Sequence, residues 1–238
     1  MALSPVCQNV LGIDVALDDF GTGYSSLTHM RNLSANTIKI DQTFVRDLLD
    51  DPSDYSIIEG VIGLTRAFNR NIVAEGVESE AIGIMLLIMG CNNAQGDIIA
   101  RPLPVDEITP WLKNYTPNLR WIAYGGSQLT LQEQKITLLK LTTEHWFMKA
   151  NKVLSSGNGD KGVHLNTCHL GVWIERLRKD HVFDERWLGR LQKAHDRMHL
   201  QATVLLEKLP SERGASSKGL ERFRTAFEKV KDILEEKM

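Results

Sequence analysis

The N-terminal part of the chain alternates short runs rich in β-branched residues with longer runs whose apolar residues have helical spacing. The short runs, which predict strands, are 13–17, 36–40, 71–75 and 97–100. The stretches between them, which predict helices, are 25–33, 54–70 and 80–90. Strands that are apolar on both faces, with helices between them, form a parallel sheet covered by helices. This alternation therefore predicts an α/β fold.

Polar residues gather where these predicted strands end, and they are Asp18, Asp19, Lys39, Asp41, Glu75, Glu78 and Gln95. In a parallel βα array the chemistry lies at the carboxyl ends of the strands. Carboxylates, a lysine and an amide on one rim suit a divalent-metal site that activates water against a phosphate ester. The alternative is that each residue is an ordinary cap or surface charge.

The C-terminal part has a different pattern. Residues 104–130 shift towards proline, glycine and threonine, and four amphipathic helical stretches follow at 131–156, 166–180, 185–209 and 218–237. Four such segments joined by short polar loops predict a four-helix bundle. The predicted domains are a βα region at 1–114, a linker at 115–130 and the helical bundle at 131–238.

Histidines are concentrated in this helical region, at positions 145, 164, 169, 181, 195 and 199, together with Cys168. His195 and His199 are four residues apart and so share one face of a helix, as two ligands of one metal must. The alternative for this pair is a solvated helix face. His164, His169 and His181 are interpreted as loop or surface histidines.

Composition narrows the functional classes. The net charge of −2 and the lack of a dominant basic patch argue against a general nucleic-acid binder. The most apolar run, 84–89, is too short to cross a bilayer, and the N-terminus lacks the pattern of a secretory signal. We therefore expect a cytoplasmic protein without a membrane segment.

Four motifs in register carry a resemblance to a known family: "ALDDFGTGYSSL", "TIKIDQTFV", "IVAEGVES" and "AQGDIIARPLP". From about residue 11 to about 114, the chain resembles the second half of bacterial EAL domains, the TIM-barrel phosphodiesterases that hydrolyse cyclic di-GMP. The resemblance implies a partial TIM barrel. It also implies that Asp18 binds one Mg²⁺ or Mn²⁺ ion and that Asp19 holds or bridges the second. Lys39 and Asp41 would position the water nucleophile, and Glu75 would be the base or support it.

Two further roles are implied by the same resemblance: Glu78 would brace the loop after the first strand, and Gln95 would orient the metal-bound water. The "GTGYSS" stretch resembles the dimer-contacting lid of the family. The Glu-Ala-Leu signature, an Asn ligand and a further Glu ligand are not found in this sequence. We therefore expect the chain to be inactive alone, with cyclic di-GMP, a second copy or a complementing EAL or GGDEF protein as partners. The alternative is an active phosphodiesterase whose barrel is completed by another chain or a longer parent.

The stretches "HWFMKANKVL", "VHLNTCHLGVW" and "HDRMH" resemble the chemoreceptor zinc-binding (CZB) domain of bacterial cytoplasmic signalling proteins. This second resemblance implies a tetrahedral Zn²⁺ site made by His145, Cys168, His195 and His199. Together the two resemblances predict a signalling protein with an incomplete EAL region and a zinc-binding regulatory domain. Zinc occupancy, or oxidation of Cys168, would change the helix packing.

Overall fold

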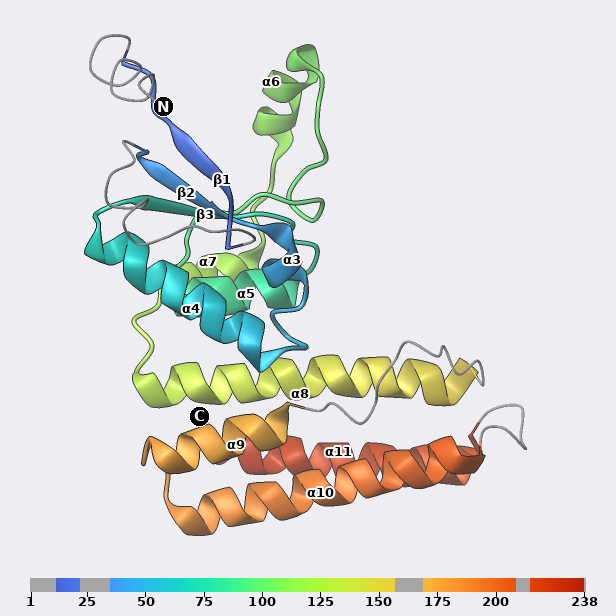
Figure 1. Ribbon diagram of the computed structural model, residues 1–238. Helices are drawn as coiled ribbons and strands as arrows, with labels where there is room; N and C mark the ends of the chain where they lie inside the picture. Colours follow the sequence, from blue (N-terminus) through green and yellow to red (C-terminus); the bar gives the residue numbers. More distant parts are fainter. Residues whose placement is uncertain (1–11, 22–34, 157–168, 209–214, 238) are drawn as a thin grey trace. The chain divides into compact units, whose positions relative to one another are not determined.

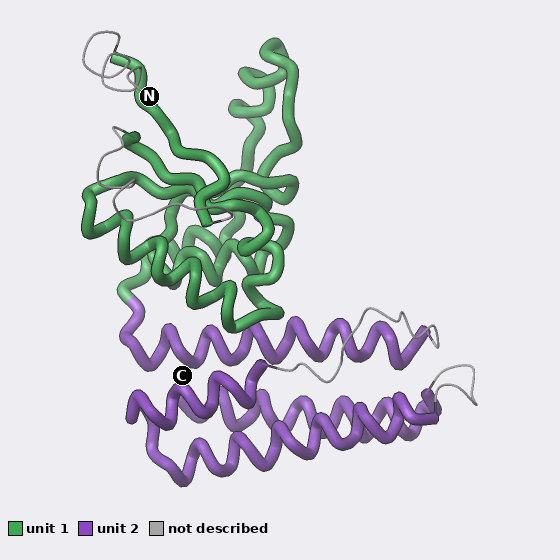
Figure 2. The backbone as a smooth tube through the Cα atoms, viewed as in Figure 1, with its two compact units in different colours: residues 1–128 green, residues 129–238 purple. Residues whose placement is uncertain are grey.

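The computed structural model describes residues 12–21, 35–156, 169–208 and 215–237. The chain divides into two compact units, Met1–Gln128 and Leu129–Met238, which Figure 2 shows in separate colours. Within the described residues, no helix combines the length and apolar character that crossing a membrane requires.

In its described residues, the first unit has a parallel sheet of three strands, β1 (Ala16–Phe20), β2 (Thr37–Ile40) and β3 (Asn71–Ala74), in the order β1-β2-β3. The pairing of β1 with β2 shifts register between Leu17 and Phe20. The small parallel sheet predicted from the sequence is confirmed. Its central residues Ile38, Ile40 and Ala74 are buried in the core of this unit.

The predicted fourth strand at 97–100 is wrong. Residues 97–99 form a turn, in which the amides of Ile99 and Ala100 donate to the carbonyl of Gly96. The extra pairing beside β3 comes earlier, where Ala94 bridges to Ala74. Apolar runs of this length predict a buried strand, but Ile98 is 47% exposed, and an isolated run does not distinguish a strand from a turn.

The described residues of the first unit form five helices: α3 (Gln42–Arg46), α4 (Pro52–Ala67), α5 (Glu80–Met89), α6 (Val105–Asn114) and α7 (Leu119–Gly125). Capping sets the bounds of α4 and α5, because Asp51 caps α4 ahead of Pro52, and Ser79 caps α5, which ends at Gly90 in the left-handed conformation. Figure 1 shows α6 standing apart from α4, α5 and α7.

Helix α7 lies inside the stretch 115–130 that the sequence predicts as linker. Its Trp121 donates an indole hydrogen bond to the carbonyl of Glu80 at 3.0 Å, and Asn118 and Arg120 bind the Glu80 carboxylate. Gly83 leaves room for the Trp121 ring, since a Cβ at this position would lie 2.5 Å from the indole. Contacts with α5 therefore make α7 part of the first unit.

The second unit is largely helical and contains α8 (Leu131–Ser156), α9 (Leu170–Lys179), α10 (Glu185–Lys208) and α11 (Ser217–Glu235). Each helix buries an apolar stripe against its neighbours. Between α8 and α11, the rings of Phe147 and Phe227 are stacked with their centroids 3.8 Å apart.

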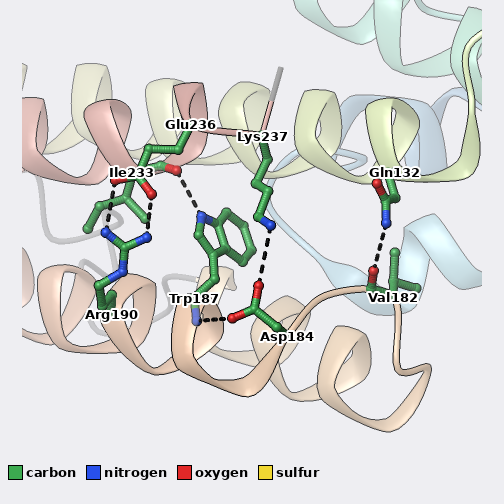
Figure 3. A network of polar contacts seen from close by, with 8 residues as sticks. All are labelled: Gln132, Val182, Asp184, Trp187, Arg190, Ile233, Glu236 and Lys237. Carbon is green, nitrogen blue, oxygen red and sulfur yellow. Dashed lines mark hydrogen bonds and ion pairs between the residues drawn. The ribbon is translucent and has the colours of Figure 1, made fainter.

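A polar network ties the start of α10 to the end of α11 (Figure 3). The Asp184 carboxylate accepts from the amide of Trp187 at 2.8 Å and pairs with Lys237. The buried indole of Trp187 donates to the carbonyl of Ile233, and Arg190 forms an ion pair with Glu236. Figure 3 also shows Gln132 of α8 donating to Val182, in the connection between α9 and α10.

Candidate functional site

The carboxyl ends of β1, β2 and β3 bring four of the predicted site residues together. The ammonium of Lys39 lies 2.8 Å from Oδ1 of Asp18 and forms a second ion pair with Glu75. The amide of Gln95 donates to Oε1 of Glu75 at 2.8 Å. A continuous chain of polar contacts therefore runs from Asp18 on β1 to Gln95 beyond β3.

The irregular end of β1 positions the two adjacent aspartates. The register shift between Leu17 and Phe20 coincides with a left-handed backbone at Asp19, whose φ is 51°. Bulges of this kind re-aim side chains and are common beside active sites, and Asp tolerates the left-handed region better than most residues. Carboxylate oxygens of Asp18, Asp19 and Glu75 lie within 4.8 Å of one another.

Asp41 is held by its own turn. Its carboxylate caps α3, accepting from the amide and the hydroxyl of Thr43 at 2.8 Å and 2.5 Å. The hydroxyl and amide hydrogen bonds from Thr43 lower the pKa of Asp41. This helix cap is local and can be predicted from the sequence, because Asp followed two residues later by Thr is a helix-capping pattern.

The charges on the rim perturb one another. A hydrogen bond with Asp41, with smaller contributions from desolvation and the neighbouring carboxylates, raises the pKa of Asp19. Hydrogen bonds to Asp18 and then to Glu75 raise the pKa of Lys39, so its ammonium form is favoured. An additional cation would relieve the repulsion at Asp19, and clustered carboxylate oxygens are the donors that Mg²⁺ and Mn²⁺ prefer. The residues present therefore fit a divalent-metal site.

Glu78 has a different environment. Its carboxylate pairs with Arg46 of α3, with Nε and Oε1 2.9 Å apart, and both side chains are about half exposed. The stretch that Glu78 is expected to brace lies outside the described residues, except for Gly21.

In the second unit, the predicted pair of histidines lies inside the helical packing. The His195 side chain is 8% exposed, and the ring centroids of His195 and His199 are 4.5 Å apart. Nδ1 of His195 lies 3.2 Å from Oδ1 of Asp196. Nε2 of His199 is buried and has no hydrogen-bond partner in the described part of the chain.

Burial keeps both rings neutral near neutral pH. Desolvation, and secondly the neighbouring His195, lowers the pKa of His199 to about 4. Desolvation also lowers the pKa of His195, against the opposing effect of Asp196. A neutral imidazole is the form that binds a metal, and an unpaired buried nitrogen requires a partner. The burial of the pair contradicts a solvated helix face, and metal binding by it stays a prediction.

Of the other proposed zinc ligands, His145 is described but is not brought together with the pair. Among the described residues, the one group of three or more His, Cys, Asp or Glu residues whose ligand atoms all lie within 4.8 Å of one another is Asp18, Asp19 and Glu75. His145 is half-buried on α8, next to Trp146, whose ring centroid lies 4.2 Å from that of His199. Cys168 lies outside the described residues, as does His164. The first turn of α9 is close to the histidines, since a Cβ on Gly171 would lie 3.6 Å from Cε1 of His195.

Trp146 is next to His145 in the sequence, and this position does not indicate its contact with His199. The two residues are on different helices, α8 and α10, and their meeting depends on how these helices pack. His181, by contrast, is exposed in the connection before α10, in line with its interpretation as a surface histidine.

Comparison with known proteins finds a family match within the first unit. Residues 2–102 match the EAL domain family. The chain is 42% identical over 100 residues to the bifunctional diguanylate cyclase/cyclic di-GMP phosphodiesterase MucR of Pseudomonas aeruginosa, an alignment that covers 42% of this chain and 15% of the relative. It is 40% identical over 116 residues to the cyclic di-GMP phosphodiesterase PdeR of Escherichia coli, covering 48% of this chain and 18% of the relative.

Among solved structures, the EAL domain of Mycobacterium smegmatis DcpA is 44% identical over 45% of this chain and 48% of that chain, with a TM-score of 0.43. The matches to MucR and PdeR span less than a fifth of each relative's length. Residues 2–102 are therefore similar to the EAL domain family, and two relatives of this segment are named as cyclic di-GMP phosphodiesterases.

Proposed function

We propose that the chain is part of a bacterial, cytoplasmic cyclic di-GMP signalling protein, in which an EAL-type phosphodiesterase segment is joined to a zinc-binding regulatory unit. The observation that carries the first half of this proposal is the polar chain on the sheet rim. Asp18, Lys39 and Glu75 come from three different strand ends and contact one another within a segment that matches the EAL family.

In this proposal, Asp18 and Asp19 would hold Mg²⁺ or Mn²⁺, and the Glu75 carboxylate lies within 4.8 Å of theirs. The bound metal would polarise a phosphate oxygen and lower the pKa of a bound water. Lys39 and Asp41 hold the attacking water in place, Glu75 accepts its proton, and Gln95 orients Glu75 through their hydrogen bond. The ammonium of Lys39 also offers positive charge to the phosphodiester of cyclic di-GMP.

We expect these residues alone to be insufficient for turnover. The sequence contains no Glu-Ala-Leu tripeptide, and the further Asn and Glu ligands of the family are also not found in it. A metal held by only part of its ligands binds loosely and does not fix the in-line geometry that phosphodiester attack requires.

The test is to incubate the purified chain with cyclic di-GMP and Mg²⁺ or Mn²⁺ and to measure the linear product by chromatography. The expected result is no product above a protein-free control. The informative variants are Lys39→Ala and Glu75→Ala, and the matched control is Asp97→Ala, which removes an exposed carboxylate paired with Arg101. Turnover that is lost in the first two variants and kept in the third would contradict inactivity.

One observation favours a second candidate function, in which the chain is an active phosphodiesterase whose barrel is completed by another chain. In the described sheet, β1 pairs with β2 and stands at the edge, and Ala16, Asp18 and Asp19 are exposed. An exposed edge strand is a template for further pairing. A second copy, or a complementing EAL or GGDEF protein, would then supply the remaining ligands.

The second half of the proposal concerns a CZB-type zinc site in the helical unit. His145, Cys168, His195 and His199 would provide three imidazole nitrogens and one thiolate, a complete tetrahedral set for Zn²⁺. Nε2 of His199, which is buried and has no hydrogen-bond partner among the described residues, supports this assignment. With no position left for water, the metal would serve structure or sensing. Loss of zinc, or oxidation of Cys168, would loosen the helix packing and so regulate the attached EAL segment.

A further inference from the structure

Trp146 links the proposed zinc site to the rest of the helical unit. Its side chain is on α8 and is 7% exposed. Its ring centroid lies 4.2 Å from that of His199 on α10, with the planes tilted by 34°. It also contacts Phe223 of α11 edge to face, with centroids 6.1 Å apart. Three helices therefore meet at this one indole.

The two histidines of the pair are held in different ways. His195 has the carboxylate of Asp196 beside its Nδ1, which is the usual kind of contact that fixes the ring of a metal ligand. His199 has instead the flat indole of Trp146 against its ring. Since Nε2 of His199 is buried and unpaired in the described part of the chain, ring packing is what restricts its orientation there.

We propose that Trp146 is a positioning residue for the zinc centre, holding the His199 imidazole in the plane required for metal binding through ring-to-ring packing. This inference rests on the proposed zinc site. It assigns Trp146 no bond to the metal. Because the same indole contacts Phe223, Trp146 also connects His199 to α11 by ring packing.

The main variants separate ring packing from other effects. Trp146→Leu removes the flat face and should weaken zinc binding by about tenfold or more, the usual effect of losing a residue that orients a metal ligand. Trp146→Phe keeps a flat ring and should bind zinc within about threefold of the unchanged chain. Zinc affinity is measured by competition with a chromophoric chelator, and the ligand field by the visible spectrum of the Co²⁺ form.

The matched control is Trp187→Leu. Trp187 is also a buried tryptophan of this unit, but it contacts Phe183 and donates to the carbonyl of Ile233. Trp187→Leu should lower the melting temperature and leave zinc affinity and the Co²⁺ spectrum unchanged. Equal weakening of zinc binding in both leucine variants would show that Trp146 acts through general stability, which would overturn the proposal.

A fluorescence measurement keeps the test decisive if Trp146→Leu does not fold. Adding zinc to the unchanged chain should alter tryptophan emission, and Trp146→Phe should lose that change while Trp187→Phe keeps it. If the unchanged chain binds no zinc, the zinc site itself is wrong. Two results would show that only the role of Trp146 is wrong, provided that the unchanged chain binds zinc. Trp146→Phe would bind zinc as weakly as Trp146→Leu, or it would keep the change in tryptophan emission on adding zinc.

Discussion

His199 places a titratable imidazole in the interior of the helical unit, and this gives a prediction for the metal-free chain. Its pKa in the folded chain is about 4, against an ordinary value of 6.5, because burial disfavours the charged ring. Below the ordinary value, the unfolded chain takes up a proton that the folded chain does not. The free energy of unfolding should therefore decrease as pH falls through the interval between these two values.

The measurement is urea unfolding of the metal-free chain, followed by helical circular dichroism, from about pH 7 to about pH 4.5. His199→Gln should flatten the decline, because glutamine does not titrate. His181→Gln is the matched control, since His181 is exposed, and it should keep the full slope. An unchanged pH dependence in His199→Gln would show that His199 is not buried in its neutral form.

At the scale of elements, the docking of α7 on α5 depends on one glycine. A Cβ at Gly83 would lie 2.5 Å from Nε1 of Trp121, so a larger side chain must displace the indole. Gly83→Leu should lower the stability of the first unit by about 1–3 kcal/mol, the usual cost of overpacking. Limited trypsin digestion should then cleave faster at Arg120, which lies on α7.

The control for this prediction is Gly63→Ala on α4, where nothing lies within 4 Å of an added Cβ. Alanine has the higher helix propensity, so this variant should be neutral or more stable by about 0.5–1 kcal/mol. Cleavage at Arg120 at the same rate in Gly83→Leu as in the unchanged chain would contradict the docking described for α7.

The helices of the first unit show which elements can be predicted from the sequence. Helices α4 and α5 were predictable because their caps, Asp51, Ser79 and Gly90, are adjacent to apolar periodic runs. Helix α7 was not, because it is short and its contacts, Trp121 and Arg120 with Glu80, join residues about forty positions apart. The turn at 97–99 was mistaken for a strand because an isolated apolar run has no period that separates the two.

The candidate site residues also divide into contacts that the sequence predicts and contacts that depend on the three-dimensional packing. Parallel pairing explains why residues at strand ends meet, so the contacts of Lys39 with Asp18 and Glu75 agree with expectation. The irregularity at Asp19 and the ion pair of Glu78 with Arg46 depend on backbone bends that no spacing rule contains. The packing of Trp146 on His199 likewise depends on how α8 and α10 cross.

At the scale of the whole molecule, the proposed function needs an EAL-like segment followed by a helical unit that binds zinc. The two compact units meet in sequence at Gln128 and Leu129, directly before α8. Regulation then requires that zinc changes the helical unit, because a ligand acts only through its different affinity for two states. The zinc site is therefore the central claim.

The most direct test is elemental analysis of the purified chain after removal of loosely held metal, with ligand variants measured in parallel. The account predicts about one zinc per chain, lost in Cys168→Ala and His195→Ala, because each removes one of four tetrahedral ligands. Cys91→Ala and His181→Ala should keep the metal, since Cys91 is buried in the first unit and His181 is exposed. A chain without zinc, or zinc retained in the Cys168 and His195 variants but lost in a His164 or His181 variant, would contradict the account.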